Sequence, residues 1–149
     1  MFVSKKLAAD FKIKRHNETK MKTILDISKK FIEKQNSGCF SHELGVLYIN
    51  RVNQNRDSIG CLLPAPLLNG HFGLISDDAQ KPLVNAIIQK FQVDVCKYSE
   101  RVKFINFLQD LQDAHDLVFD EFDHSLSGEV PEFSGNCNQI AFAYKLISV

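Results

Sequence analysis

Residues 99–119, with the sequence SERVKFINFLQDLQDAHDLVF, identify the chain as one built from long helices. Apolar residues recur there every three or four positions, which is the spacing of one face of an α-helix. Ser99 is a suitable amino-terminal cap, so the pattern predicts a helix from residue 99 to about residue 122. The predicted apolar face consists of Val102, Ile105, Leu108, Leu111, Val118 and Phe119.

Three further segments show the same helical spacing. The first is predicted at about residues 18–36, with Asn17 or Thr19 as its cap and Gly38 just after its end. The second begins at Ser76 or Asp77, and the last spans about residues 136–146. Their predicted buried residues are Met21, Ile24, Leu25, Phe31 and Ile32; Leu83, Val84, Ile87, Ile88 and Phe91; and Ile140, Phe142 or Ala143, and Tyr144.

A β-hairpin is predicted between the first two helices. Residues 45–52 are rich in β-branched and aromatic residues, residues 53–57 are typical of a turn, and residues 58–63 suggest a short return strand. Pro64 and Pro66 end it, because proline has no amide hydrogen for a strand ladder. A hairpin is not stable alone, so the fold class is predicted as α+β: a mainly helical single domain with one short hairpin packed on about four helices.

Length and composition indicate one ordinary globular domain. The chain has 149 residues, of which 44% are hydrophobic and 24% are charged, and this excludes collagen-like, disordered and rod-like coiled-coil proteins. We expect residues 1–16 to form a basic arm or a weak helix and residues 17–149 to form the globular domain. No run of 18 apolar residues exists, so no membrane partner is expected.

The charges are unevenly distributed although the net charge is +0. Residues 1–34 contain ten basic and four acidic residues, whereas residues 108–132 contain eight acidic residues and no lysine or arginine. The arm could bind phosphates through Lys5, Lys6, Lys12, Lys14 and Arg15. Its low aromatic content and the neutral total charge argue against nucleic acid as the main partner.

The four cysteines do not form a metal-binding or redox motif. They stand far apart at positions 39, 61, 96 and 137, without a Cys-x-x-Cys pair. No secretion signal precedes them, so free thiols in a reducing cytoplasm are expected. The sequence thus predicts no metal site and no cofactor.

Several motifs together resemble a family of small, uncharacterised phage and prophage proteins. The chain carries a Leu-Tyr pair at residues 47–48, the block GCLLP at residues 60–64, LQDLQDAHD at residues 108–116 and an Ile-Ala pair at residues 140–141. The order and spacing are similar to those of the family from about Met21 onward. The resemblance implies an accessory protein in a bacterial host cytoplasm and implies no reaction.

Two positions depart from the family pattern. Asp57 stands where the family has the first cysteine of its block, and Val46 stands where the family has a cysteine before the Leu-Tyr pair. These departures argue against a shared metal site built from those cysteines.

Three residues are candidates for catalysis. Cys61 is a possible nucleophile with His115 as its base and Asp116 as the group that orients the base, which would make a hydrolase-type enzyme. The structural alternative is that Cys61 packs as a small apolar side chain beside a close backbone approach at Gly60. Likewise, His115 lies on the apolar helix face, so we expect it to be buried and hydrogen-bonded to the strands that end at Cys61.

A second set of residues is spaced like metal ligands. Asp116, Asp120 and His124 are four residues apart, which places them on one helix face if the helix continues. Three ligands on one face converge poorly on a tetrahedral ion, so this alternative is disfavoured.

The sequence as a whole favours a protein that acts by binding a protein partner of unknown identity. An enzyme using Cys61 or the His115–Asp116 pair is the alternative, and nucleic-acid binding through the basic arm is a third hypothesis. An enzyme predicts a polar pocket shared by Cys61 and His115, whereas a binding protein predicts an exposed apolar or charged patch.

Overall fold

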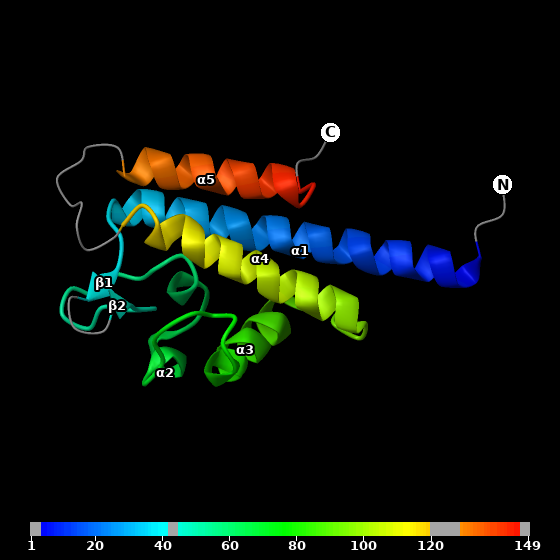
Figure 1. Ribbon diagram of the computed structural model, residues 1–149, viewed down its shortest axis with the longest axis horizontal. Coiled ribbons are helices and arrows are strands. Elements are labelled where there is room, and N and C mark those ends of the chain that lie inside the picture. The colour runs from blue at the N-terminus through cyan, green and yellow to red at the C-terminus, as the bar shows by residue number, and fades with distance from the viewer. Residues whose placement is uncertain (1–3, 42–44, 120–128, 147–149) are drawn as a thin grey trace.

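Three long helices form the body of the protein. The computed structural model describes residues 4–41, 45–119 and 129–146. Within them α1 (Lys5–Gln35), α4 (Tyr98–Asp116) and α5 (Glu129–Ala143) contact one another pairwise, and Figure 1 shows them lying side by side. The short helices α2 (Ala65–Leu68) and α3 (Lys81–Phe91) lie on the side of α4 away from α5 (Figure 1).

Helix α1 is longer than its sequence pattern predicts. It begins at Lys5, because the Ser4 hydroxyl caps it by accepting a hydrogen bond from the Leu7 amide at 3.1 Å. It ends before Asn36, which adopts a left-handed conformation with φ 58°. Its apolar face packs into the body through Met21, Ile24, Leu25 and Ile32. Residues 5–16 therefore belong to the same helix as the predicted segment 18–36.

The predicted α+β class is wrong, because the described residues are mainly helical and form no sheet layer. In the described chain, strand pairing is limited to β1 (Phe40–Ser41) against β2 (Gly45–Val46) and two isolated bridges. The predicted return strand instead contains a 3₁₀ helix, η1 (Gly60–Leu62). A propensity for β structure over a few residues is overridden when the segment packs against helices, as η1 does against α1.

Gly60 explains why this segment packs as a tight turn. A Cβ atom built on Gly60 would lie 1.9 Å from the carbonyl oxygen of Tyr48, so only glycine fits. The close backbone approach predicted for this glycine is confirmed. Tyr48 itself is fully buried, and its hydroxyl donates to the carbonyl of Gly73 at 2.7 Å.

The helices predicted from residue 76 or 77 and from residue 99 are present as η2 with α3 and as α4, and their boundaries and buried faces differ from the prediction. A 3₁₀ helix, η2 (Asp78–Gln80), precedes α3, and Leu83, Val84 and Ile87 of α3 are buried. The buried face of α4 is centred on Phe104, Phe107, Leu108 and Leu111, whereas Val102 of the predicted face is 37% exposed. Helix α4 ends at Asp116, earlier than predicted.

Helix α5 begins seven residues before its predicted start. Pro131 lies in its first turn, where the missing amide hydrogen has no helical partner to lose. The helix buries Phe133, Cys137, Ile140 and Ala141 against α1 and α4. The prediction that Phe142 or Ala143 is buried is wrong, because both side chains are exposed.

Candidate functional site

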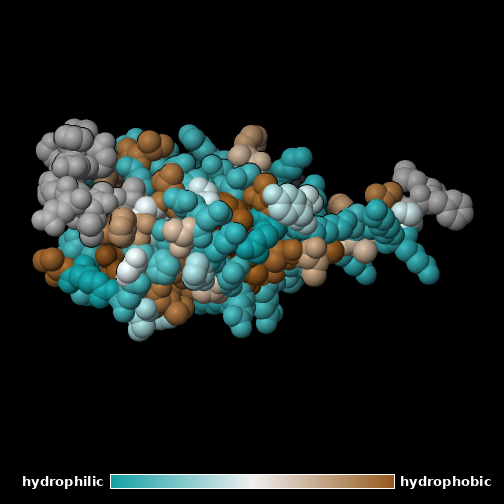
Figure 2. All heavy atoms as spheres, turned by 60° about the horizontal axis from the view of Figure 1, so that its bottom comes forward, coloured by the Kyte–Doolittle hydropathy of each residue, from teal (hydrophilic) through white to brown (hydrophobic). Residues whose placement is uncertain are grey.

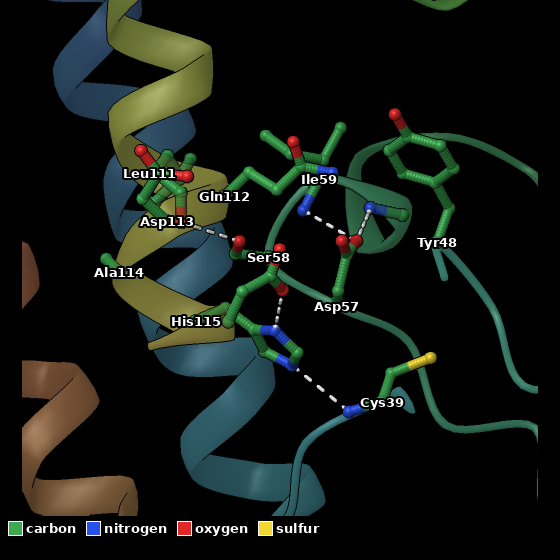
Figure 3. A network of polar contacts seen from close by, with 12 residues as sticks. Cys39, Tyr48, Asp57, Ser58, Ile59, Leu111, Gln112, Asp113, Ala114 and His115 are labelled. Carbon is green, nitrogen blue, oxygen red and sulfur yellow. Dashed lines mark hydrogen bonds and ion pairs between the residues drawn. The ribbon is translucent and has the colours of Figure 1, made fainter. Parts of the chain in front are cut away.

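A cluster of three titratable residues lies where the carboxyl end of α4 meets the loop before η1. Asp57 comes from that loop, and His115 comes from the last turn of α4 (Figure 3). Asp116 follows His115 and is the last residue of α4. One ligand-type atom from each residue lies within 4.8 Å of the others. Asp57 and His115 are fully buried, and the side chain of Asp116 is 21% exposed. The cluster therefore lies inside the protein and reaches solvent on the Asp116 side.

Asp57 organises the turn that precedes η1. Its Oδ1 accepts hydrogen bonds from the amides of Ile59 at 3.0 Å and Gly60 at 2.6 Å (Figure 3). An aspartate that binds the amides two and three residues ahead stabilises a turn against an extended strand. This local geometry is a second reason why residues 58–63 do not form the predicted strand.

Burial raises the pKa of the Asp57 carboxyl to about 7. Desolvation of the charged form is the largest cause, and the neighbouring Asp116 carboxylate adds to it. The two backbone hydrogen bonds lower the pKa but do not cancel the effect of burial. Asp57 is thus a carboxyl group for which ionisation is costly in the folded protein.

The hydrogen bonds of His115 define its protonation state. The amide of Cys39 donates to Nε2 of His115 at 3.1 Å, so Nε2 carries a lone pair and no hydrogen. Nδ1 then carries the ring hydrogen and donates it to Oδ1 of Asp116 at 2.8 Å. His115 is therefore a neutral imidazole in this arrangement.

The prediction that His115 is buried and hydrogen-bonded is confirmed, but its predicted partner is wrong. The ring bonds to Cys39, in the segment that follows α1, and not to residues 58–63. Two aromatic rings also lie beside the imidazole: the ring centroid of Phe119 is 4.9 Å from that of His115, and the ring centroid of Phe133 is 6.4 Å from it.

Cys61 lies in a separate environment from His115. Its Sγ contacts the carbonyl of Ser58 at 3.3 Å and the hydroxyl of Ser28 at 3.6 Å, and no hydrogen bond joins it to His115 within the described chain. Burial raises the pKa of the Cys61 thiol to about 12, so the nucleophilic thiolate is disfavoured. The structure does not assemble Cys61, His115 and Asp116 as a nucleophile, its base and an orienting group.

The other two residues of the predicted metal set and the other histidines of the chain are dispersed or lie outside the described residues. Asp120 and His124 of the alternative metal set, together with His42, fall in segments that the structure does not describe. His16 bonds to the carbonyl of Gln92 at 2.7 Å, and His71 bonds to Gln80 at 2.8 Å. Neither histidine belongs to the cluster around Asp57.

Sequence reasoning did not assign a site role to Asp57. The available signal was its position three residues before Gly60, just ahead of the GCLLP block. Proximity to Asp116 was not predictable, because 59 positions of sequence separate the two residues.

The predicted basic residues all lie on the amino-terminal part of α1. Lys5, Lys6, Lys12, Lys14 and Arg15 are exposed. The guanidinium of Arg15 lies 5.1 Å from the ring centroid of Phe11, so basic and apolar side chains are interleaved there.

Comparison of the chain with protein-family models, with curated proteins and with solved structures found no match. Among the described helices, none combines the length and the apolar composition needed to cross a bilayer.

Proposed function

We propose that this protein acts by binding a protein partner through the amino-terminal part of α1, residues 5–15, which we call the α1 arm. The setting implied by the family resemblance, a phage-type accessory protein in a bacterial cytoplasm, is part of the same proposal. The observation that carries it is the exposure of two large apolar side chains on the arm. Leu7 is 60% exposed and Phe11 is 56% exposed.

These two side chains share one face of the helix. They are four residues apart, so they lie one above the other on α1. In Figure 1 the arm extends past the ends of α4 and α5, and Figure 2 shows it projecting from the body with apolar and polar side chains exposed. An apolar stripe on a projecting helix is the feature by which helices dock into grooves of partner proteins.

The arm is held in place before any partner binds. The side-chain amide of Asn17 donates to the carbonyl of Asp94 at 2.8 Å and to Glu100 at 2.9 Å, and its oxygen accepts from the Asp94 amide at 2.8 Å. Asp10 forms an ion pair with Lys97. A helix that is already formed and anchored loses less conformational entropy on binding.

Charge indicates the chemistry of the partner. The arm carries five exposed basic residues, while its single acid, Asp10, is paired with Lys97. Opposite charges across an interface favour association and orientation. The partner we propose is a protein with an apolar groove bordered by acidic side chains.

The test is capture of a partner from nuclease-treated bacterial lysate by the full chain. Replacing Leu7 and Phe11 together with serine is expected to abolish capture and leave the melting temperature unchanged, since both side chains are exposed. The matched control replaces two exposed apolar residues elsewhere, Val52 and Leu117, and is expected to capture normally. Capture that survives the loss of Leu7 and Phe11 would contradict the proposal.

To distinguish a nucleic-acid partner from a protein partner, binding of the full chain to a fluorescent DNA duplex is measured at low salt. Replacing the basic residues of the arm with glutamine weakens a phosphate-dominated complex, whereas the Leu7 and Phe11 double variant leaves it intact. Tight duplex binding that depends only on the basic residues would contradict a protein partner and would indicate that the arm binds nucleic acid.

A further inference from the structure

The fully buried Asp57 meets the partly exposed Asp116 in the protein, with the His115 ring beside both. One oxygen from each of Asp57 and Asp116 lies within 4.8 Å of the other. Among the described residues, no lysine or arginine forms an ion pair with either carboxylate. Two neighbouring negative charges in a low-dielectric interior repel strongly and need a compensating positive charge.

The hydrogen bonds account for only half of the carboxylate oxygens. Oδ1 of Asp57 accepts from the amides of Ile59 and Gly60, and Oδ1 of Asp116 accepts from His115. Oδ2 of Asp57 and Oδ2 of Asp116 are both buried and have no hydrogen-bond partner in the described chain. Buried polar atoms in native proteins are almost always satisfied, so two such atoms in one cluster indicate a bound ligand.

His115 does not supply the missing charge. Its two ring nitrogens are occupied by the Cys39 amide and by Asp116, which leaves no lone pair for a ligand. Reversing the tautomer would place a ring hydrogen against the Cys39 amide hydrogen. His115 therefore acts on the site through Asp116, whose carboxylate it orients.

We propose that Oδ2 of Asp57 and Oδ2 of Asp116 bind a hard divalent cation, Mg²⁺ or Mn²⁺, with His115 as the positioning residue for Asp116. Both available ligand atoms are carboxylate oxygens, which these cations prefer over nitrogen or sulfur. Mg²⁺ typically uses one or two protein carboxylates and keeps several waters. The side chain of Asp116 is 21% exposed although its Oδ2 is buried, so the waters that complete the coordination would enter beside this side chain.

The cation would connect two segments that are far apart in the sequence. Asp57 begins the turn into η1 (Figure 3). Asp116 is the last residue of α4. Binding to both is expected to stabilise the folded state in proportion to the logarithm of cation concentration above the dissociation constant. This site and the α1 arm share no residue, so either proposal can fail without the other.

The experiment measures Mn²⁺ binding to the full chain by electron paramagnetic resonance, after removal of metals with EDTA and at about pH 8 so that the carboxyls are ionised. We expect saturation at one Mn²⁺ per chain, competition by Mg²⁺ and a higher melting temperature with either cation. Absence of saturable binding by the folded wild type would overturn the proposal.

Three variants locate the site. Asp57→Asn and Asp116→Asn are each expected to weaken Mn²⁺ binding about 100-fold or more, and His115→Gln about 10-fold to 100-fold. The matched control, Asp113→Asn, changes another carboxylate of α4 and is expected to bind normally. Normal binding in both Asp57→Asn and Asp116→Asn would also overturn the proposal, and two separate variants guard against one that fails to fold.

A proton bound to one of the two carboxyl groups would also remove the repulsion between their negative charges. Infrared spectroscopy distinguishes such a proton from a bound cation. A carboxylic-acid C=O band in the wild type at about pH 8, with saturating Mg²⁺ present and lost in Asp57→Asn, would show that a proton holds the site. That result would overturn the cation proposal.

Discussion

The backbone amide of Cys39 donates a hydrogen bond to Nε2 of His115 at 3.1 Å, and this bond joins the segment after α1 to the end of α4. Because an amide can only donate, it holds the imidazole in one neutral tautomer whose other nitrogen faces Asp116. His115 is fully buried and is surrounded by Phe119 and Phe133. The residue thus has structural partners on every polar atom.

Replacing His115 with alanine is expected to destabilise the protein by about 2–4 kcal/mol, because it leaves a cavity and an unsatisfied Cys39 amide. His115→Gln is expected to cost less, since an amide oxygen can still accept from Cys39. Chemical denaturation of both variants measures the difference. A midpoint of His115→Ala equal to that of the wild type would refute a structural role for this histidine.

Asp57 is expected to make the metal-free protein less stable as the pH rises. The pKa of its carboxyl is raised from 3.8 to about 7 in the folded state, so the folded protein holds this proton more tightly than the unfolded chain. The stabilisation is full below about pH 4 and is lost as the pH rises through about 7. The groups that act on Asp57 are Asp116 and His115.

Asp57→Asn tests this effect, because asparagine resembles the protonated acid. In EDTA, the wild type and the variant are expected to have similar free energies of unfolding near pH 4, with the wild type less stable by about 1 kcal/mol or more near pH 8. Urea titrations at each pH measure the difference between the two proteins, which removes the contribution of other titrating groups. A difference that does not change with pH would contradict the prediction.

Gly60 and Gly135 are expected to respond oppositely to alanine. At Gly60 the new Cβ would lie 1.9 Å from a backbone oxygen, and the required shift is expected to cost about 2 kcal/mol or more. At Gly135, inside α5, nothing lies within 4 Å of the new Cβ, and alanine is expected to stabilise the protein by about 0.5–1 kcal/mol. Thermal denaturation of both variants measures the two signs, and equal effects would be inconsistent with the described packing.

Asn17 is expected to be the main anchor between α1 and the segment that enters α4. Asn17→Ala removes three hydrogen bonds from a buried position and is expected to cost about 1–3 kcal/mol. Thr19→Ala on the same helix is the control, because in the described chain the Thr19 hydroxyl donates only to the carbonyl of Arg15, within α1. Loss of stability in the control equal to that in Asn17→Ala would argue against an anchoring role.

Several features of this protein were predictable from sequence because they depend on periodic patterns. The 3.6-residue spacing of apolar side chains located α1, α3, α4 and α5, with different boundaries, and the position of His115 on the apolar face of α4 indicated its burial. The exposure of the basic residues before Asn17 also agrees with their charge. Each of these features depends on the pattern of residues within a single helix, and that pattern can be read directly from the sequence.

The other features depend on contacts between segments that are distant in sequence. Residues 45–63 carry β-prone side chains, yet the contact of Gly60 with Tyr48 and the turn made by Asp57 decide their conformation. The meeting of Asp57 with Asp116 arises only when the end of α4 packs beside that turn. Secondary-structure propensity contributes only tenths of a kcal/mol per residue, whereas burying an apolar side chain contributes more. Burial and close packing therefore determined the conformation wherever they conflicted with local propensity.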